Sequence, residues 1–196
     1  MTERGFADVA AQSAHAFRSI MQAMARPGCV MDIGVDIAAP EPLLASTAAV
    51  ALTLCDFQTP VWLAPELRSE TVMHYLRVHT GAPITEDASL ALFVIVAAGQ
   101  GLPPPSLLLQ GTHEYPDRSA TIVIQTAGFA PGAVVLTGPG IRGSASLGVA
   151  GLDDCYWAAL AENHARFPTG VDVIFAAPRQ VAALPRSSTI RKLETA

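Results

Sequence analysis

The stretch Gly111-Thr-His-Glu-Tyr-Pro-Asp-Arg-Ser-Ala-Thr-Ile-Val-Ile-Gln125 joins a polar loop directly to an apolar strand. A buried strand holds its backbone rigid while the loop before it presents side chains, an arrangement that often carries function in α/β proteins. The next strand signal, residues 134–137, follows after a connection of only eight residues. That connection is too short for a crossover helix, so these two strands are expected to pair antiparallel.

Outward from this point, helical and strand patterns alternate along the whole chain. Apolar periodicity and capping residues predict helices at 6–24, 46–54, 69–79 and 153–164, with Ser46 and Ser69 as N-caps. Short apolar runs predict strands at 29–33, 60–64, 90–97, 121–125, 134–137, 170–176 and 181–184. This mixture predicts an α/β fold with a central mixed sheet flanked by helices.

The length of 196 residues suits one domain, with a core over about 6–190 and a short polar C-terminal tail from Arg186 onward. Apolar residues make up 51% of the chain and charged residues only 15%, against a typical ~25% charged. So few charges cover a monomer's surface poorly. We therefore expect some apolar surface to be hidden in an oligomer or a larger assembly.

The charge pattern and the cysteines exclude several classes of protein. The net charge is −5 with no basic stripe, which argues against nucleic-acid binding. No signal core and no apolar run of ~20 residues is present, so we expect no membrane span. Cys29, Cys55 and Cys155 lack metal-ligand spacing and are expected to be reduced thiols in a cytoplasmic protein.

Two motifs resemble ligand sites but lack the context that such sites need. Residues 138–143 match the letters G-x-G-x-x-G, yet a poor helix start follows, so a sharp strand-to-loop turn is favoured over a dinucleotide fingerprint. His74 and His79 are five residues apart, which separates them by about 140° around a helix. A metal site on this pair is not expected, and a helix-end role for His79 is favoured.

The polar loop carries enough ionisable groups for acid–base work, in His113, Glu114, Tyr115, Asp117 and Arg118. Plain turn chemistry explains the same residues equally well, with Asp117 as a cap and Arg118 paired locally. No G-x-S-x-G elbow is present, and no catalytic residue can be assigned.

Arg186 precedes three hydroxyl residues and fits either an anion site or a solvated strand end. The candidate ligand-binding residues, for a phosphonate or an ATP-derived group, are Arg77, His79, Tyr115, Arg118 and Arg186.

Seven segments in this order give the chain a family resemblance. They are Phe17-Arg-Ser-Ile-Met-Gln-Ala-Met-Ala-Arg-Pro-Gly28, Asp56-Phe-Gln-Thr-Pro-Val-Trp-Leu63, Arg77-Val-His-Thr-Gly-Ala-Pro83, Gly111-Thr-His-Glu-Tyr-Pro-Asp-Arg-Ser-Ala-Thr121, Leu136-Thr-Gly-Pro-Gly-Ile141, Phe167-Pro-Thr-Gly-Val-Asp172 and Ala183-Leu-Pro-Arg186. Together they resemble the PhnH subunit family of the bacterial carbon–phosphorus lyase system.

The resemblance implies a role in phosphonate catabolism. The family joins a core complex that transfers the ribose 5-triphosphate moiety of ATP to methylphosphonate and releases adenine. It also implies homodimers when isolated, other core subunits as partners, and a fold similar to the large domain of pyridoxal-phosphate (PLP)-dependent transferases without PLP. The only lysine is Lys192 in the polar tail, and a PLP Schiff base needs a lysine held in a pocket.

Three hypotheses follow. The first is an assembly subunit that is inactive when isolated. The second is a protein that itself binds a phosphorylated substrate. The third is a stand-alone hydrolase that uses His113 or Asp117.

Overall fold

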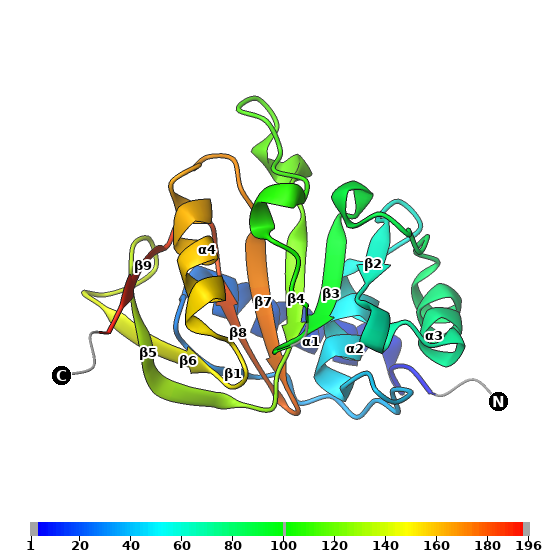
Figure 1. Cartoon of the computed structure of the whole chain (residues 1–196). Helices are drawn as coiled ribbons and strands as arrows, with labels where there is room; N and C mark the ends of the chain where they lie inside the picture. The colour runs from blue at the N-terminus through cyan, green and yellow to red at the C-terminus, as the bar shows by residue number, and fades with distance from the viewer. Residues whose placement is uncertain (1–3, 100, 194–196) are drawn as a thin grey trace.

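A six-stranded mixed sheet forms the centre of the molecule in a computed structural model that describes residues 4–99 and 101–193 (Figure 1). In spatial order its strands are β1 (Met31–Asp32), β8 (Gln180–Leu184), β7 (Asp172–Ala177), β4 (Thr121–Gln125), β3 (Phe93–Ala97) and β2 (Val61–Leu63). Strands β2, β3, β4 and β7 run parallel, and β8 runs antiparallel to β7 and to β1. The predicted mixed α/β architecture is therefore confirmed.

The register of the parallel strands brings their beginnings into one row. Phe93 pairs with Thr121, and Thr121 pairs with Asp172. The loops that enter these strands consequently meet at one edge of the sheet, here called the amino edge, and the loops that leave them meet at the opposite carboxyl edge.

The helices begin and end where their capping residues stand. The Asp8, Ser69 and Asp153 side chains accept the backbone N–H of Ala11, Val72 and Tyr156, at the starts of α1 (Val9–Ala25), α3 (Glu70–Thr80) and α4 (Asp154–His164). Gly81 ends α3 with φ 72°, a left-handed conformation that glycine adopts without strain. The predicted starts of the last two helices are confirmed.

The expected N-cap of α2 (Ala45–Leu54) is wrong, because Leu44 and not Ser46 is its N-cap. The Leu44 N–H instead donates to the Gln125 side-chain oxygen at 2.7 Å. A long-range contact from β4 thus satisfies the N-cap amide of α2. In many other helices a side chain that is close in sequence plays this part.

The central sheet separates two apolar cores. Helices α1 and α2 cover one face, where Ile95, Val123 and Ile174 point. The opposite face carries Ile122 and Ile124 and is covered by α4 and a second sheet. Successive residues of β4 therefore serve different cores, as the two-residue period of a strand requires.

The second sheet contains β6 (Ala145–Val149), β5 (Phe129–Thr137) and β9 (Thr189–Lys192) in that order, all antiparallel. The expected antiparallel pairing of residues 121–125 with 134–137 is therefore wrong. Both edges of β4 are already taken by the parallel strands β3 and β7, so β5 leaves the central sheet. The polar tail expected from Arg186 onward is also corrected, because it includes β9.

Among the described residues, no helix combines the length and apolar character needed to cross a bilayer.

Candidate functional site

The polar loop protrudes from the amino edge and is closed at its base by a bridge between Gln110 and Ser119 (Figure 1). Inside the loop, the Tyr115 N–H donates to the Thr112 hydroxyl at 2.9 Å, and the Thr112 N–H donates to the Tyr115 carbonyl at 3.1 Å. Gly111 has φ 69°, and a Cβ there would lie 2.8 Å from the Pro116 carbonyl oxygen. Only glycine fits this position, so the loop is a tightly built turn.

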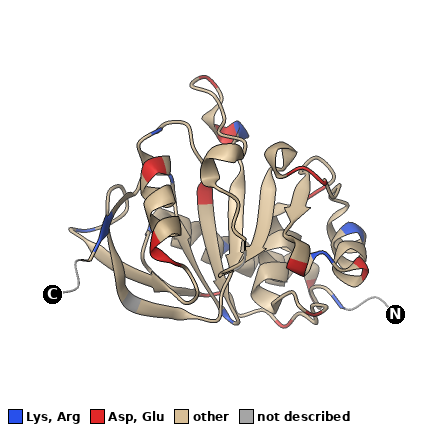
Figure 2. Ribbon diagram, in the orientation of Figure 1, with Lys and Arg blue, Asp and Glu red and all other residues tan. Residues whose placement is uncertain are grey.

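Charged residues of both signs belong to this loop, at the top of the view in Figure 2. The Arg118 guanidinium lies over the Tyr115 ring, with 4.3 Å between its carbon and the ring centroid. This is cation–π geometry. Asp117 does not cap the turn, because Tyr115 occupies the N-cap position of the 3-10 turn Pro116–Arg118. Within the described part of the chain, no acceptor is hydrogen-bonded to the Arg118 guanidinium, so its donors are available to a ligand.

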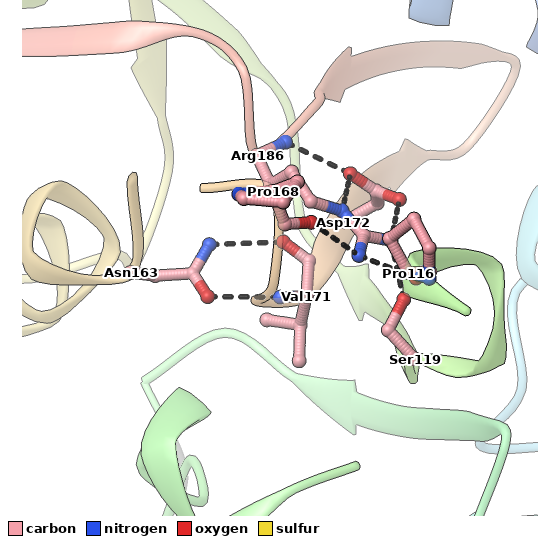
Figure 3. A network of polar contacts seen from close by, with 7 residues as sticks. All are labelled: Pro116, Ser119, Asn163, Pro168, Val171, Asp172 and Arg186. Carbon is pink, nitrogen blue, oxygen red and sulfur yellow. Dashed lines mark hydrogen bonds and ion pairs between the residues drawn. The ribbon is translucent and has the colours of Figure 1, made fainter. Parts of the chain in front are cut away.

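Arg186 contacts this loop through a polar network (Figure 3). Its Nε and Nη2 donate to the Asp172 carboxylate at 3.2 and 2.6 Å, and Nη2 also donates to the Ser119 hydroxyl. Its Nη1 donates to the carbonyls of Pro116 at 2.7 Å and Pro168 at 3.5 Å.

These five contacts match the five N–H donors of a guanidinium. The structure thus gives Arg186 a structural role between three loops. Anion binding by Arg186 stays a prediction that this geometry does not favour.

Asn163 forms a second polar clamp at the same edge (Figure 3). Its Nδ2 donates to the Val171 carbonyl at 2.9 Å, and its Oδ1 accepts the Val171 N–H at 2.8 Å. Asn163 and Val171 are both buried. The clamp fixes the segment that leads into β7.

Arg77 and His79 do not join Tyr115, Arg118 and Arg186. Both lie on the exposed side of α3, which packs against α2 beside the β2 edge of the sheet. The His79 ring lies 4.5 Å from the Tyr75 ring, centroid to centroid. The five candidates therefore divide between α3 and the amino edge.

A pocket of about 420 Å³ lies at the amino edge, and its lining residues are Met24, Pro116, Asp117, Phe167, Pro168, Asp172, Pro185, Arg186 and Ser187. Most of this lining is apolar. Of its three charged residues, Asp172 and Arg186 pair with each other, and Asp117 adds one carboxylate. The pocket thus suits an apolar group. No local sequence signal identifies it, because its walls come from four separate segments.

A second pocket, of about 350 Å³, lies at the carboxyl edge, where α/β sheets often bind ligands. Gln125 and Thr126 at the end of β4 line it. The Gln125 amide is occupied by the Leu44 N–H and the Pro42 carbonyl, and the Thr126 hydroxyl donates to the Ala150 carbonyl at 2.7 Å. Sequence analysis missed these two residues, although polar side chains at the end of a buried strand are a usable signal.

The G-x-G-x-x-G segment forms the turn between β5 and β6, as expected. A Cβ on Gly140, whose φ is 79°, would lie 2.1 Å from the carbonyl oxygen of Ala25 at the end of α1. Close packing against α1 explains why a glycine occupies this position. No helix begins in residues 138–143, so the segment presents no helix N-terminus to a nucleotide.

The perturbed ionisable groups lie outside the polar loop. Burial, followed by the nearby Asp56 charge, raises the pKa of Cys55 to about 12. Burial raises the pKa of Tyr156, and the Ser89 hydroxyl lowers the pKa of Asp87. No group of three or more metal-ligating side chains occurs in residues 4–99 and 101–193.

Comparison with known proteins matches residues 4–191 to a family described as bacterial phosphonate metabolism protein (PhnH). A relative from Rhizobium meliloti (strain 1021), the α-D-ribose 1-methylphosphonate 5-triphosphate synthase subunit PhnH, is 36% identical over 188 residues, which cover 95% of this chain and 94% of the relative. A putative C-P lyase subunit protein HtxG from Stutzerimonas stutzeri is 32% identical over 176 residues, which cover 89% of this chain and 84% of the relative.

Proposed function

The chain belongs to the PhnH family, and from this premise we propose that it is a subunit of an α-D-ribose 1-methylphosphonate 5-triphosphate synthase in phosphonate catabolism. In this role it supports the transfer of the ribose 5-triphosphate moiety of ATP to methylphosphonate, with release of adenine. Its partners are the other core subunits of the carbon–phosphorus lyase complex.

Agreement over nearly the whole length carries this proposal. The match to the synthase subunit covers 95% of this chain and 94% of the relative. The HtxG relative, named as a C-P lyase subunit, points to the same kind of complex.

The geometry supports an assembly role for this subunit, in which the isolated chain has no turnover. Arg186 and Asp172 are engaged with each other and with loop carbonyls. Tyr115 and Arg118 stack together on an exposed loop, while His79 lies on a separate helix. The candidates are thus dispersed, whereas a self-sufficient catalytic site needs an acid, a base and a nucleophile within hydrogen-bond reach.

We also propose a similarity to the large domain of PLP-dependent transferases, without PLP itself. The central sheet with a pocket at the carboxyl ends of parallel strands supports the likeness. The residues present do not fit the cofactor, because the only lysine, Lys192, lies on β9 and pairs with Asp154 at 2.6 Å. The carboxyl-edge pocket is lined by no lysine. A cytoplasmic location and a homodimer in the isolated state complete the proposal.

Reconstitution tests this function directly. The other core subunits are purified with and without this chain and supplied with ATP and methylphosphonate, and adenine release is measured. We expect stable co-purification, adenine release from the full set, and none from the isolated chain. Failure of the chain to associate with the other subunits under native conditions would remove the proposal, and turnover by the isolated chain would remove the assembly role.

A second candidate function is favoured by the available donors of Arg118. A guanidinium held over an aromatic ring is pre-oriented to receive a phosphate or phosphonate oxygen. Calorimetry with ATP and methylphosphonate, in the presence of the partner subunits, compares the wild type with Arg118→Ala. Binding that is lost in Arg118→Ala supports this candidate, and equal affinity of both proteins removes it.

A further inference from the structure

Five large apolar side chains are exposed in the loops at the amino edge. They are Phe57, Leu90, Leu107, Tyr115 and Phe167, with exposed fractions of 73%, 61%, 66%, 48% and 58%. We call this set the amino-edge rim. Scattered single exposed apolar residues are common on protein surfaces, but five at one edge form an apolar concentration that needs an explanation.

The sheet register places the rim residues on neighbouring loops. Phe57, Leu90 and Phe167 come four, three and five residues before β2, β3 and β7. Leu107 comes three residues before the Gln110–Ser119 bridge that precedes β4, and Tyr115 lies in the loop that this bridge closes. Adjacent strands are ~4.8 Å apart, so the beginnings of these four neighbouring strands span roughly 14 Å, within the width of an ordinary protein–protein interface.

Hydrogen bonds join these loops to one another. The Gly170 N–H donates to the Gln110 carbonyl at 2.9 Å, and Arg166 donates to the Gln110 side chain at 3.3 Å. Arg186 donates to the Pro116 carbonyl at 2.7 Å. The segments that carry Leu107, Tyr115 and Phe167 are therefore held as a preformed surface, which reduces the ordering cost of binding.

The amino-edge pocket opens beside the rim, and Phe167 belongs to both. Because the donors of Arg186 are taken by protein acceptors, the pocket lining offers no free cation to an anion. Pro116, Phe167 and Pro185 line it with apolar surface. A pocket of this kind beside exposed aromatic residues is where an interface buries an apolar anchor from its partner.

The charge of the surrounding loops indicates which kind of partner this surface fits. The loop segments 55–60, 81–92, 101–120 and 165–171 carry five carboxylates and two arginines. The carboxylates are Asp56, Glu86, Asp87, Glu114 and Asp117. Glu86 pairs with Arg68, which leaves four carboxylates against the two arginines. An acidic surround repels nucleic acid and anionic lipid and attracts a protein surface that carries Arg and Lys.

We propose that the amino-edge rim is the surface on which another core subunit of the complex docks, with an apolar side chain in the amino-edge pocket and basic residues around it. This inference rests on the proposed function and adds which face of the chain meets the partner. The occupant is a subunit of different sequence, since a second copy of this chain would bring the same acidic loops to the interface.

The test compares charge insertion on the rim with the same change elsewhere. Leu107→Glu and Phe167→Glu alter the rim, and Met21→Glu alters an apolar residue on α1 that is 49% exposed. Each full-length variant is checked by thermal unfolding, and its affinity for the other core subunits is measured by surface plasmon resonance. We expect the affinity of each rim variant to be at least about tenfold lower than that of the wild type. Met21→Glu should bind like the wild type. Raising the salt concentration should weaken binding.

Wild-type affinity in a folded Leu107→Glu or Phe167→Glu protein overturns the docking surface and leaves the proposed function intact. An equal loss in Met21→Glu also overturns it, because the effect would then not be specific to the rim. If the rim variants become monomeric but still join the complex, the rim is the contact between two copies of this chain. That result overturns the inference. If the wild type itself does not associate, the proposed function fails as well.

Discussion

Arg186 and Asp172 face each other in a two-point ion pair, with Nε–Oδ1 and Nη2–Oδ2 distances of 3.2 and 2.6 Å. Their side chains are only 12% and 19% exposed. The Asp172 carboxylate also accepts the Arg186 backbone N–H at 2.8 Å. The pair therefore joins the end of β8 to the beginning of β7 and, through Pro116, to the polar loop.

Asp172→Ala is expected to destabilise the protein by about 2 kcal/mol, because it leaves a largely buried guanidinium without its counter-charge. Urea unfolding measures the change in free energy. Asp154→Ala is the matched control, since the Asp154–Lys192 pair is 57–71% exposed and should contribute about 0.5 kcal/mol or less. Equal effects of the two substitutions would contradict the structural role of Arg186.

Asn163→Ala is expected to cost roughly 2–4 kcal/mol, because the N–H and the C=O of Val171 both lose their partner in a buried position. For a chain of this size the corresponding fall in melting temperature is ~4–16 °C. Scanning calorimetry measures it, with Glu162→Ala on the exposed side of α4 as the control. A change as small as that of the control would show that the clamp contributes nothing.

The two serines once expected to cap helices should respond differently to alanine. Ser69→Ala removes the N-cap bond to Val72 and should cost about 1 kcal/mol. Ser46 caps nothing, and its buried hydroxyl is without a hydrogen-bond partner among the described residues. Ser46→Ala should therefore be neutral or slightly stabilising. Chemical denaturation of both variants compares them, and a larger loss at Ser46 would refute the corrected start of α2.

Cys55 should make the protein less stable at high pH. Its pKa is about 12 in the folded chain against 9.0 for an unperturbed thiol, so the unfolded state loses the proton first as pH rises above 9. Below pH 9 both states are protonated and the group has no effect. Between pH 9 and 12 it should lower the unfolding free energy by about 1.4 kcal/mol per pH unit.

Unfolding midpoints of the wild type and Cys55→Ala at pH 8 and pH 10 isolate this contribution from other titrating groups. The wild type should lose more stability than the variant over that interval. Parallel losses in the two proteins would mean that the thiol is not shielded from water.

Local signals were sufficient for much of the fold. Ser69 and Gly81 mark the two ends of α3 through contacts with residues within four positions, and such contacts are readable from sequence. The pairing of β5 was not readable in this way. A short connection favours a hairpin, but whether β4 has a free edge depends on β3 and β7, which lie far away in the chain.

In the candidate site, too, contacts between residues close in sequence could be predicted, and contacts between distant residues could not. Tyr115 and Arg118 are three residues apart, and their contact follows from a single tight turn. The partners of Arg186 lie 14, 18, 67 and 70 residues away, so only the folded chain brings them together. Gln125 and Leu44 present the same problem across 81 residues.

Strand β4 supplies Ile122 and Ile124 to one core and Val123 to the other. Because neighbouring residues of this strand pack into different cores, the stabilities of the two cores depend on each other. If one core loosens, β4 moves, and the residues that β4 supplies to the other core move with it. Heating should accordingly melt both in a single cooperative step, and the β4 amides should be among the last to exchange their hydrogens with deuterated solvent.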